Sequence, residues 1–155
     1  MKRNVFAAML ILGLSALTAS SATGPQVPFK LTDNGNLTFT SQTSANVAGT
    51  GIASHAGRGI SAGTINVTGP ASCSGGMSAT INGTFTGANG DGISYTVHQQ
   101  LCPTASQGVF AGVGSYTITG GTGRFANATG AGSFNGLGDF VALKYQCTLD
   151  GTISY

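Results

Sequence analysis

The chain has 155 residues, of which only 6% are charged, and its formal net charge at pH 7 is +2. A chain of this length suits one domain with a substantial core. The few lysines and arginines form no cluster, which argues against a nucleic-acid-binding protein, because such proteins displace counterions with grouped cations. The same observation argues against attraction to an anionic membrane surface.

The first 22 residues have the order of a secretory signal peptide. Met1–Asn4 is short and basic, Val5–Leu17 is almost entirely apolar, and residues 18–22 are small. The apolar run is shorter than the ~20 residues that a membrane-spanning helix needs. We therefore predict a signal peptide over residues 1–22, no transmembrane span, and a single secreted or periplasmic domain over residues 23–155.

The rest of the chain alternates apolar and polar residues with a period of two, which is typical of β-strands. The expected strands are 37–40, 45–54, 59–68, 77–85, 93–101, 109–119, 130–135, 140–149 and 152–155. Short glycine-rich turns separate them and no helical pattern lies between them. We expect an all-β domain of roughly eight antiparallel strands, with a closed barrel favoured over a β-sandwich.

Three cysteines in an exported chain predict a disulfide. Met77–Phe85 and Ile93–Leu101 pair naturally as a hairpin, which places Cys73 and Cys102 just beyond its open end. A bridge between these two needs only local adjustment of the chain, and we favour it over the Cys102–Cys147 pairing. Cys147 shares the alternation of the apolar residues in its own strand, so we expect a thiol that faces the core.

The stretch Tyr116–Gly130, YTITGGTGRFANATG, runs from an alternating strand into paired glycines and an arginine. Its Gly-x-Gly spacing matches part of a dinucleotide fingerprint, which requires a helix after the glycines to bind pyrophosphate. The residues that follow are too rich in glycine for a sustained helix, so we predict no nucleotide cofactor. We expect a tight corner, in which Phe125 plugs the end of the barrel and Arg124 caps carbonyls or pairs with an aspartate.

The segment His55–Arg58 is the second concentration of polar chemistry. A histidine and an arginine on one turn can hold an anionic or carbonyl-bearing ligand, although a polar turn that hydrogen-bonds the barrel rim is the simpler interpretation. A zinc site needs three or four ligands, whereas the chain has two histidines and His98 alternates with outward-facing residues. We therefore predict no metal and no cofactor.

Two stretches resemble known proteins. Gly49–Arg58, GTGIASHAGR, and Tyr116–Gly130 are similar to a group of small exported bacterial proteins without an established function. The GGTGRF core of the second also resembles the matching turn of plant dirigent proteins and of the allene oxide cyclase barrel. The resemblance implies an eight-stranded antiparallel barrel of the calycin type. It carries no catalytic residue over, because allene oxide cyclases use a buried glutamate and this chain has none.

The leading functional hypothesis is a non-enzymatic exported barrel that binds a small, largely apolar ligand, or that serves as an envelope or extracellular component. Small inward-facing residues leave room for a cavity in a barrel of this size. We expect aromatic residues to line it, drawn from Phe39, Tyr95, Phe110, Tyr116, Phe134 and Tyr145, with Tyr95, Phe110, Tyr116 and Tyr145 as the ligand-binding candidates.

Two alternatives belong to other functional classes. A dirigent-like or cyclase-like catalyst needs an ionisable side chain inside the barrel, and the candidates are His55, Arg58 and Asp139. An adhesin or pilus-type subunit is favoured by the low charge and the abundance of threonine and glycine, and it needs a strand donated by another chain. The oligomeric state is left open.

Overall fold

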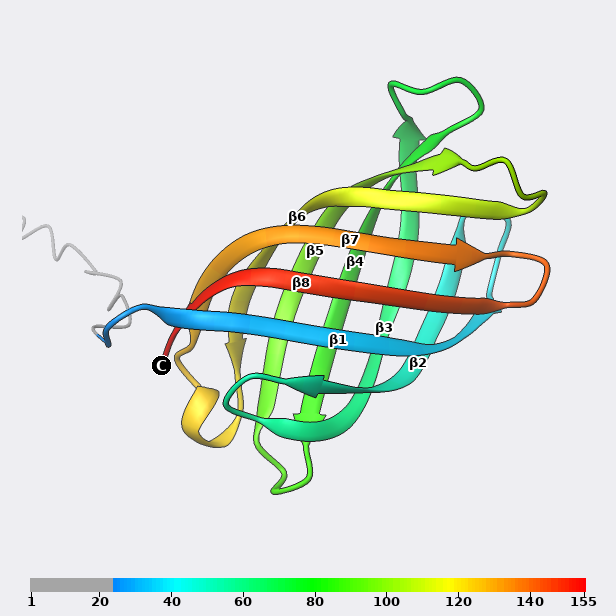
Figure 1. The fold of residues 1–155 in the computed structure, drawn as a ribbon. Helices are drawn as coiled ribbons and strands as arrows, with labels where there is room; N and C mark the ends of the chain where they lie inside the picture. Colours follow the sequence, from blue (N-terminus) through cyan, green and yellow to red (C-terminus); the bar gives the residue numbers. More distant parts are fainter. Residues whose placement is uncertain (1–23) are drawn as a thin grey trace, which may run out of the picture.

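The computed structural model describes residues 24–155 and contains one closed barrel of eight antiparallel strands (Figure 1). The strands are β1 (Val27–Phe39), β2 (Ser44–Ala53), β3 (Gly57–Pro70), β4 (Met77–Gly87), β5 (Gly92–Pro103), β6 (Val109–Gly121), β7 (Thr129–Asp139) and β8 (Lys144–Ser154). Each strand pairs with its neighbours in sequence, and β1 pairs with β8 to close the sheet. The predicted barrel is confirmed, and the sandwich alternative is wrong. The predicted signal peptide lies outside the described residues.

The first strand is longer than we expected. We expected it over residues 37–40, yet β1 begins at Val27. Asp33–Asn36 have the composition of a turn. They stay extended because β1 is hydrogen-bonded on both sides: Gly35 lies opposite Gly49 on β2 and opposite Tyr145 on β8. Pairing with two neighbouring strands therefore overrides the local preference of this segment.

The last two expected strands form one continuous strand, β8. Gly151, which we expected to separate them, pairs with Gly132 on β7 and with Phe29 on β1, so the ladder continues past it. The turn before β8 covers residues 140–143 instead. Leu143 there adopts a left-handed backbone with φ of 56°, a conformation that is uncommon for a residue other than glycine.

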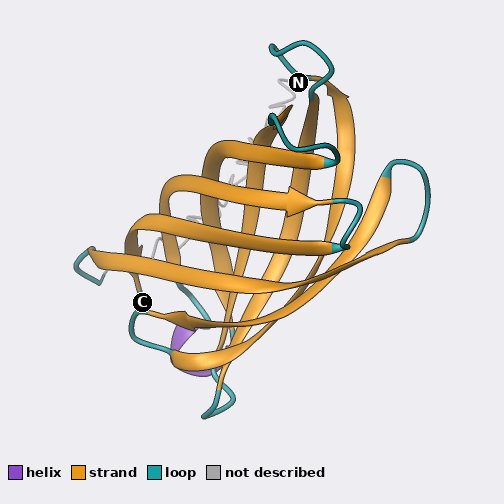
Figure 2. Cartoon of the chain, turned by 45° about the vertical axis from the view of Figure 1, so that its right-hand side comes forward, coloured by secondary structure: helices purple, strands orange, loops and turns teal. Residues whose placement is uncertain are grey.

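The barrel has two unlike ends, which we call the narrow end and the wide end. The strands converge near the chain's C-terminus, where residues 54–56, 88–91 and 122–128 connect them (Figures 1 and 2). They splay apart toward the connections at residues 40–43 and 140–143 (Figure 2). The buried apolar cluster fills the narrow half, and its largest fully buried members are Phe29, Leu31, Phe85, Ile93, Val97, Tyr116, Ile118, Phe125, Leu149 and Ile153.

The glycine-rich corner closes the narrow end, as predicted. Gly120 and Gly123 have positive φ values of 135° and 58°, which glycine adopts without a steric cost. A single 3-10 turn, η1 (Gly123–Phe125), begins at Gly123 in place of a longer helix. The Phe125 side chain is fully buried, and its ring centroid lies 4.9 Å from that of Tyr155. The corner thus plugs the barrel instead of presenting a helix terminus to phosphate.

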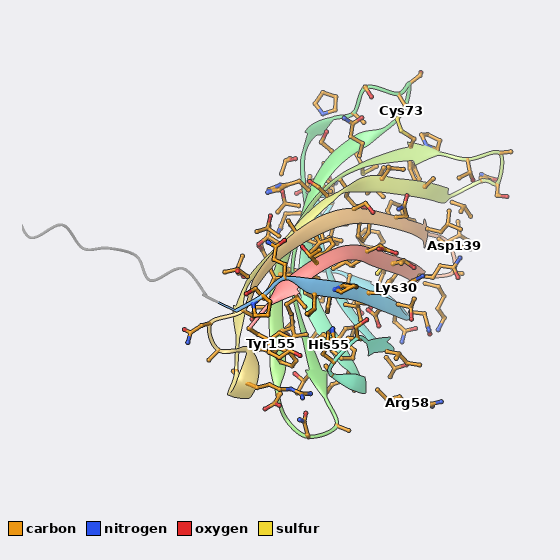
Figure 3. The ribbon with its side chains drawn as sticks, turned by 60° about the vertical axis from the view of Figure 1, so that its left-hand side comes forward. Lys30, His55, Arg58, Cys73, Asp139 and Tyr155 are labelled. Atoms are coloured by element: carbon orange, nitrogen blue, oxygen red, sulfur yellow. A yellow bond between two sulfur atoms is a disulfide. The ribbon has the colours of Figure 1, made fainter. Side chains whose placement is uncertain are left out.

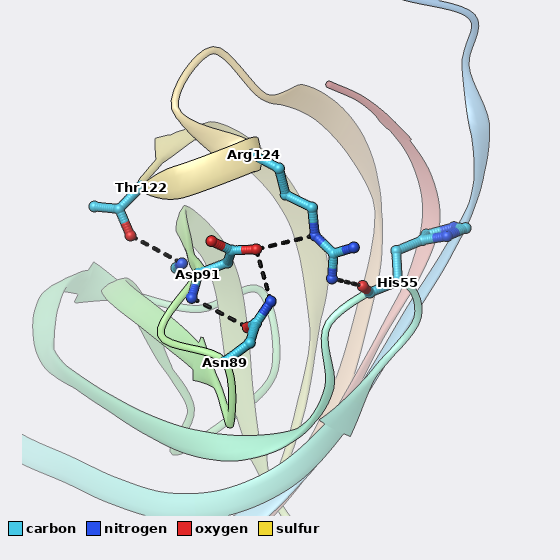
Figure 4. A network of polar contacts seen from close by, with 6 residues as sticks. His55, Asn89, Asp91, Thr122 and Arg124 are labelled. Carbon is cyan, nitrogen blue, oxygen red and sulfur yellow. Dashed lines mark hydrogen bonds and ion pairs between the residues drawn. The ribbon is translucent and has the colours of Figure 1, made fainter.

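Arg124 joins three connections at the narrow end (Figure 4). Its Nε lies 3.2 Å from Asp91 Oδ2, and its Nη2 donates a hydrogen bond to the backbone carbonyl of His55. Asn89 Nδ2 donates to the same Asp91 oxygen at 2.8 Å. Both roles predicted for Arg124, capping a carbonyl and pairing with an aspartate, are confirmed, and both are structural.

The predicted hairpin and disulfide are confirmed together. Met77 lies opposite Leu101 in the β4–β5 register. Cys73 and Cys102 form a disulfide with their Cα atoms 5.9 Å apart. The bridge fastens the connection between β3 and β4 to the end of β5, at the wide end of the barrel. Cys147 is a free, partly buried thiol.

Candidate functional site

A cavity occupies the wide half of the barrel interior. Its volume is about 60 Å³, well above the ~10–15 Å³ that one water molecule requires. Apolar side chains form most of its wall, among them Leu37, Val47, Ile65, Ile81, Leu101 and Phe140. Val47, Ile65 and Ile81 line the cavity yet are only partly buried. This part of the interior is therefore accessible from the wide end.

A carboxyl group lies inside the barrel. Asp33 on β1 lines the cavity and is only 4% exposed. Its Oδ2 accepts a hydrogen bond from Ser61 Oγ at 2.6 Å and another from the Tyr145 hydroxyl at 2.7 Å. The other oxygen, Oδ1, is buried and accepts no hydrogen bond from any residue between 24 and 155. The interior thus contains one acidic group with half of its acceptor capacity unused.

Two glycines allow Tyr145 and Ser61 to reach the same carboxylate oxygen. Gly35 on β1 and Gly49 on β2 lie between Tyr145 on β8 and Ser61 on β3 in the strand register. A Cβ atom on Gly49 would stand 2.5 Å from the Tyr145 hydroxyl oxygen, closer than non-bonded atoms can approach. The tyrosine side chain therefore lies over backbone that carries no side chain.

Sequence reasoning missed Asp33, although its strand carried a signal. Leu31, Asp33, Gly35 and Leu37 share one alternation, and both leucines are buried. In a strand, residues two apart point to the same face. Extending the expected strand backward from Leu37 would have placed Asp33 inside the barrel.

Four more polar side chains line the cavity, namely Tyr95, Gln99, Gln146 and Cys147. Burial, reinforced by the negative charge of Asp33, raises the pKa of Cys147 from 9.0 to about 12. Burial also raises the pKa of Tyr95 and that of Tyr145. All three groups are neutral at pH 7. Asp33 therefore supplies the negative charge of this site without a neighbouring cation to balance it: the ion pair between Arg124 and Asp91 is the only one within residues 24–155.

The raised pKa of Cys147 predicts a loss of stability in alkali. The unfolded thiol loses its proton from about pH 9 and the folded one only near pH 12, so deprotonation stabilises the unfolded state relative to the folded state between these values. We expect each pH unit in that interval to lower the free energy of unfolding by about 1.4 kcal/mol through this group. Urea unfolding at pH 8 and pH 10 measures the loss. Cys147→Ser should show a smaller loss, and an equal loss in both proteins would contradict this assignment.

Of the aromatic residues expected in the cavity wall, Tyr95, Phe134 and Tyr145 do line it. Tyr116 does not, because it lies deeper, in the packed narrow half. Its side chain is 1% exposed, and its ring centroid lies 6.0 Å from that of Phe29. The Tyr116 hydroxyl is buried without a hydrogen-bond partner among the described residues.

Phe39 and Phe110 lie at the rim of the wide end and are not part of the cavity wall either. Both contact Phe140, which does line the cavity: Phe110 stacks on it at a centroid distance of 5.0 Å, and Phe39 meets its edge at 5.8 Å. Phe110 was a ligand-binding candidate, and the structure instead places it behind Phe140. The three rings form an aromatic cluster beside the opening.

None of the three candidate catalytic residues, which are labelled in Figure 3, lines the cavity. His55 occupies the β2–β3 turn with φ of 65°, and its Nε2 lies 2.9 Å from the carbonyl oxygen of Pro28. Arg58 is exposed at the start of β3. Asp139 Oδ1 accepts two backbone N–H bonds, at 2.9 and 2.7 Å, from the turn that follows β7. Only Asp139 caps a turn, and none of the three residues contacts Asp33 through a hydrogen bond or ion pair.

Residues 24–155 include no group of three or more histidine, cysteine, aspartate or glutamate side chains that could hold a metal ion. No helix in that range is long and apolar enough to cross a bilayer. No protein-family model matches the chain, and neither a curated protein nor a solved structure does. The resemblance to exported bacterial proteins and to dirigent and allene oxide cyclase barrels thus stays a prediction. The function must be inferred from the cavity and its polar groups.

Proposed function

We propose that this protein is a non-enzymatic, secreted or periplasmic barrel that binds a small, largely apolar ligand in the wide half of its interior. The observation that carries the proposal is the cavity of about 60 Å³ with its mainly apolar wall. Moving apolar ligand surface from water into such a wall is favourable by roughly 25 cal/mol per Å². The Cys73–Cys102 disulfide supports an oxidising compartment.

The rim of the wide end supports entry of an apolar molecule. Phe39 is 49% exposed, and Val141 and Leu143 in the β7–β8 turn are 76% and 41% exposed. Phe39 and Phe140 connect this rim to the cavity, because their rings touch and Phe140 forms part of the wall. An apolar ligand would thus meet apolar surface from the rim inward.

Filling the cavity tests this proposal, with toluene as a probe that has no hydrogen-bonding group. Val47→Phe adds a ring where Val47 lines the wall, and we expect it to weaken toluene binding about tenfold or more, which equals a loss of 1.4 kcal/mol. Isothermal titration calorimetry measures the affinity. Ile52→Phe is the matched control, because Ile52 is on the same strand but 52% exposed. Absence of toluene binding to the wild type, or equal binding by both variants, would refute the proposal.

The dirigent-like or cyclase-like alternative retains one supporting observation. It required an ionisable group inside the barrel, and Asp33 is such a group, whereas His55, Arg58 and Asp139 are not. We keep this alternative with Asp33 as its sole acid–base candidate. Turnover of a bound hydroxylated compound by the wild type but not by Asp33→Asn would favour it.

The adhesin alternative lacks the feature it needs. A donated strand adds to an unpaired sheet edge, and each of the eight strands between residues 27 and 154 already has two partners. We therefore do not propose a subunit completed by strand donation.

A further inference from the structure

We propose that the ligand of this cavity carries a hydrogen-bond-donating head, such as a hydroxyl or an ammonium group, and that Asp33 disfavours carboxylates. The inference rests on the proposed function, since it names the chemistry of the molecule that the cavity would hold. It predicts a molecule with an apolar body and one donor group, and it excludes fatty-acid-like anions.

The first reason is the unused acceptor of Asp33. An ionised carboxylate offers about four lone-pair positions, and here two donors share Oδ2 while no described residue donates to Oδ1. Buried polar atoms in folded proteins nearly always have a partner. A ligand group that donates a hydrogen bond to Oδ1 would supply the missing partner.

The second reason is the sign of the charge inside the barrel. None of the four lysine and arginine side chains beyond residue 23 lines the cavity. Lys30, Arg58 and Lys144 are exposed, with Lys144 Nζ donating to Asn36 Oδ1 at the wide end, and Arg124 pairs with Asp91 at the narrow end. The ionisable neighbours of Asp33 that line the cavity, Tyr95, Tyr145 and Cys147, stay neutral because their pKa values are raised. A bound carboxylate would therefore meet a negative charge that no cation offsets.

The third reason is a second polar group on the opposite wall. Gln99 on β5 lines the cavity and is 6% exposed. In the closed strand order, β5 lies four strands from β1 in both directions. Apolar residues such as Val97 and Phe134 also line the cavity. A ligand with an apolar body and a polar head can use both polar groups.

Three ligands of equal chain length test the inference: hexan-1-ol, hexylammonium and hexanoate, titrated by calorimetry at pH 7 into the full folded protein. We expect hexylammonium to bind about 100-fold more tightly than hexanoate, because a charge-assisted hydrogen bond is gained in one case and a like charge is met in the other. Hexan-1-ol should also bind more tightly than hexanoate. In Asp33→Asn, the hexylammonium-to-hexanoate affinity ratio should fall at least about tenfold.

Asp150→Asn is the control for net charge, because Asp150 is an exposed carboxylate on β8. The hexylammonium-to-hexanoate affinity ratio of this variant should equal that of the wild type.

Two outcomes would overturn the inference: a wild-type affinity ratio near one, or an affinity ratio that Asp33→Asn leaves unchanged. If Asp33→Asn fails to fold, the wild-type ratio and the Tyr145→Phe variant, which removes one donor to Asp33, decide the matter. If toluene binds while the ratio is near one, only this inference falls. If toluene does not bind to the wild type, the proposed function itself falls.

Discussion

Phe125→Ala is expected to lower the free energy of unfolding by about 3–5 kcal/mol, the usual cost of removing a fully buried phenylalanine ring. The Phe125 ring closes the narrow end, packs edge-on against Tyr155, and lies 4.9 Å from the guanidinium carbon of Arg124. The 3-10 turn that holds it is only three residues long, so the turn has little stability of its own without this anchor. Urea unfolding followed by circular dichroism measures the loss.

The matched control for that prediction is Phe39→Ala. Phe39 is the same residue type at the opposite end of the barrel, but it is 49% exposed, so its truncation removes less buried surface and should cost less than about 1.5 kcal/mol. Similar losses for the two variants would mean that the narrow end is not the packed end.

Removal of the Cys73–Cys102 disulfide should lower the free energy of unfolding by about 3–4 kcal/mol. The cysteines are 29 residues apart in sequence, and the loss of loop-closure entropy in the unfolded chain gives this magnitude for a loop of that size. The paired substitution Cys73→Ser with Cys102→Ser can be compared with the wild type by thermal and urea unfolding.

The third cysteine supplies the control for the disulfide prediction. Cys147→Ser leaves the bridge intact, and the thiol it replaces is only partly buried, so its effect at pH 7 should be smaller than that of the paired substitution. If reduction of the bridge leaves the unfolding midpoint of the wild type unchanged, the disulfide does not constrain the chain in solution.

The features that sequence reasoning predicted well depend on local signals. The β4–β5 hairpin follows from two alternating segments around a glycine-rich turn, and its register then places Cys73 beside Cys102. The corner at Gly120–Gly123 could be predicted because glycines end a clear strand there. The apolar Phe125 that comes after them is buried at the end of the barrel.

The candidate site was harder to predict, because its residues meet only through the closure of the sheet. Asp33, Ser61 and Tyr145 come from β1, β3 and β8, and the sequence separation between Asp33 and Tyr145 is 112 residues. The predicted catalytic candidates were polar residues on turns, but His55 and Asp139 only hydrogen-bond to nearby backbone groups. In a barrel, the polar residues that share the inward alternation of their strands are the better candidates for a site.

The most direct test of the central claim, that the wide half of the barrel binds small apolar molecules, is a methyl NMR titration with toluene. Ile65 and Ile81 line the cavity, whereas Ile52 and Ile60 are more than half exposed and are not part of its wall. We expect the methyl signals of Ile65 and Ile81 to shift in a saturable manner while those of Ile52 and Ile60 stay in place. Shifts confined to Ile52 and Ile60, or no saturable shift at Ile65 and Ile81, would contradict the account.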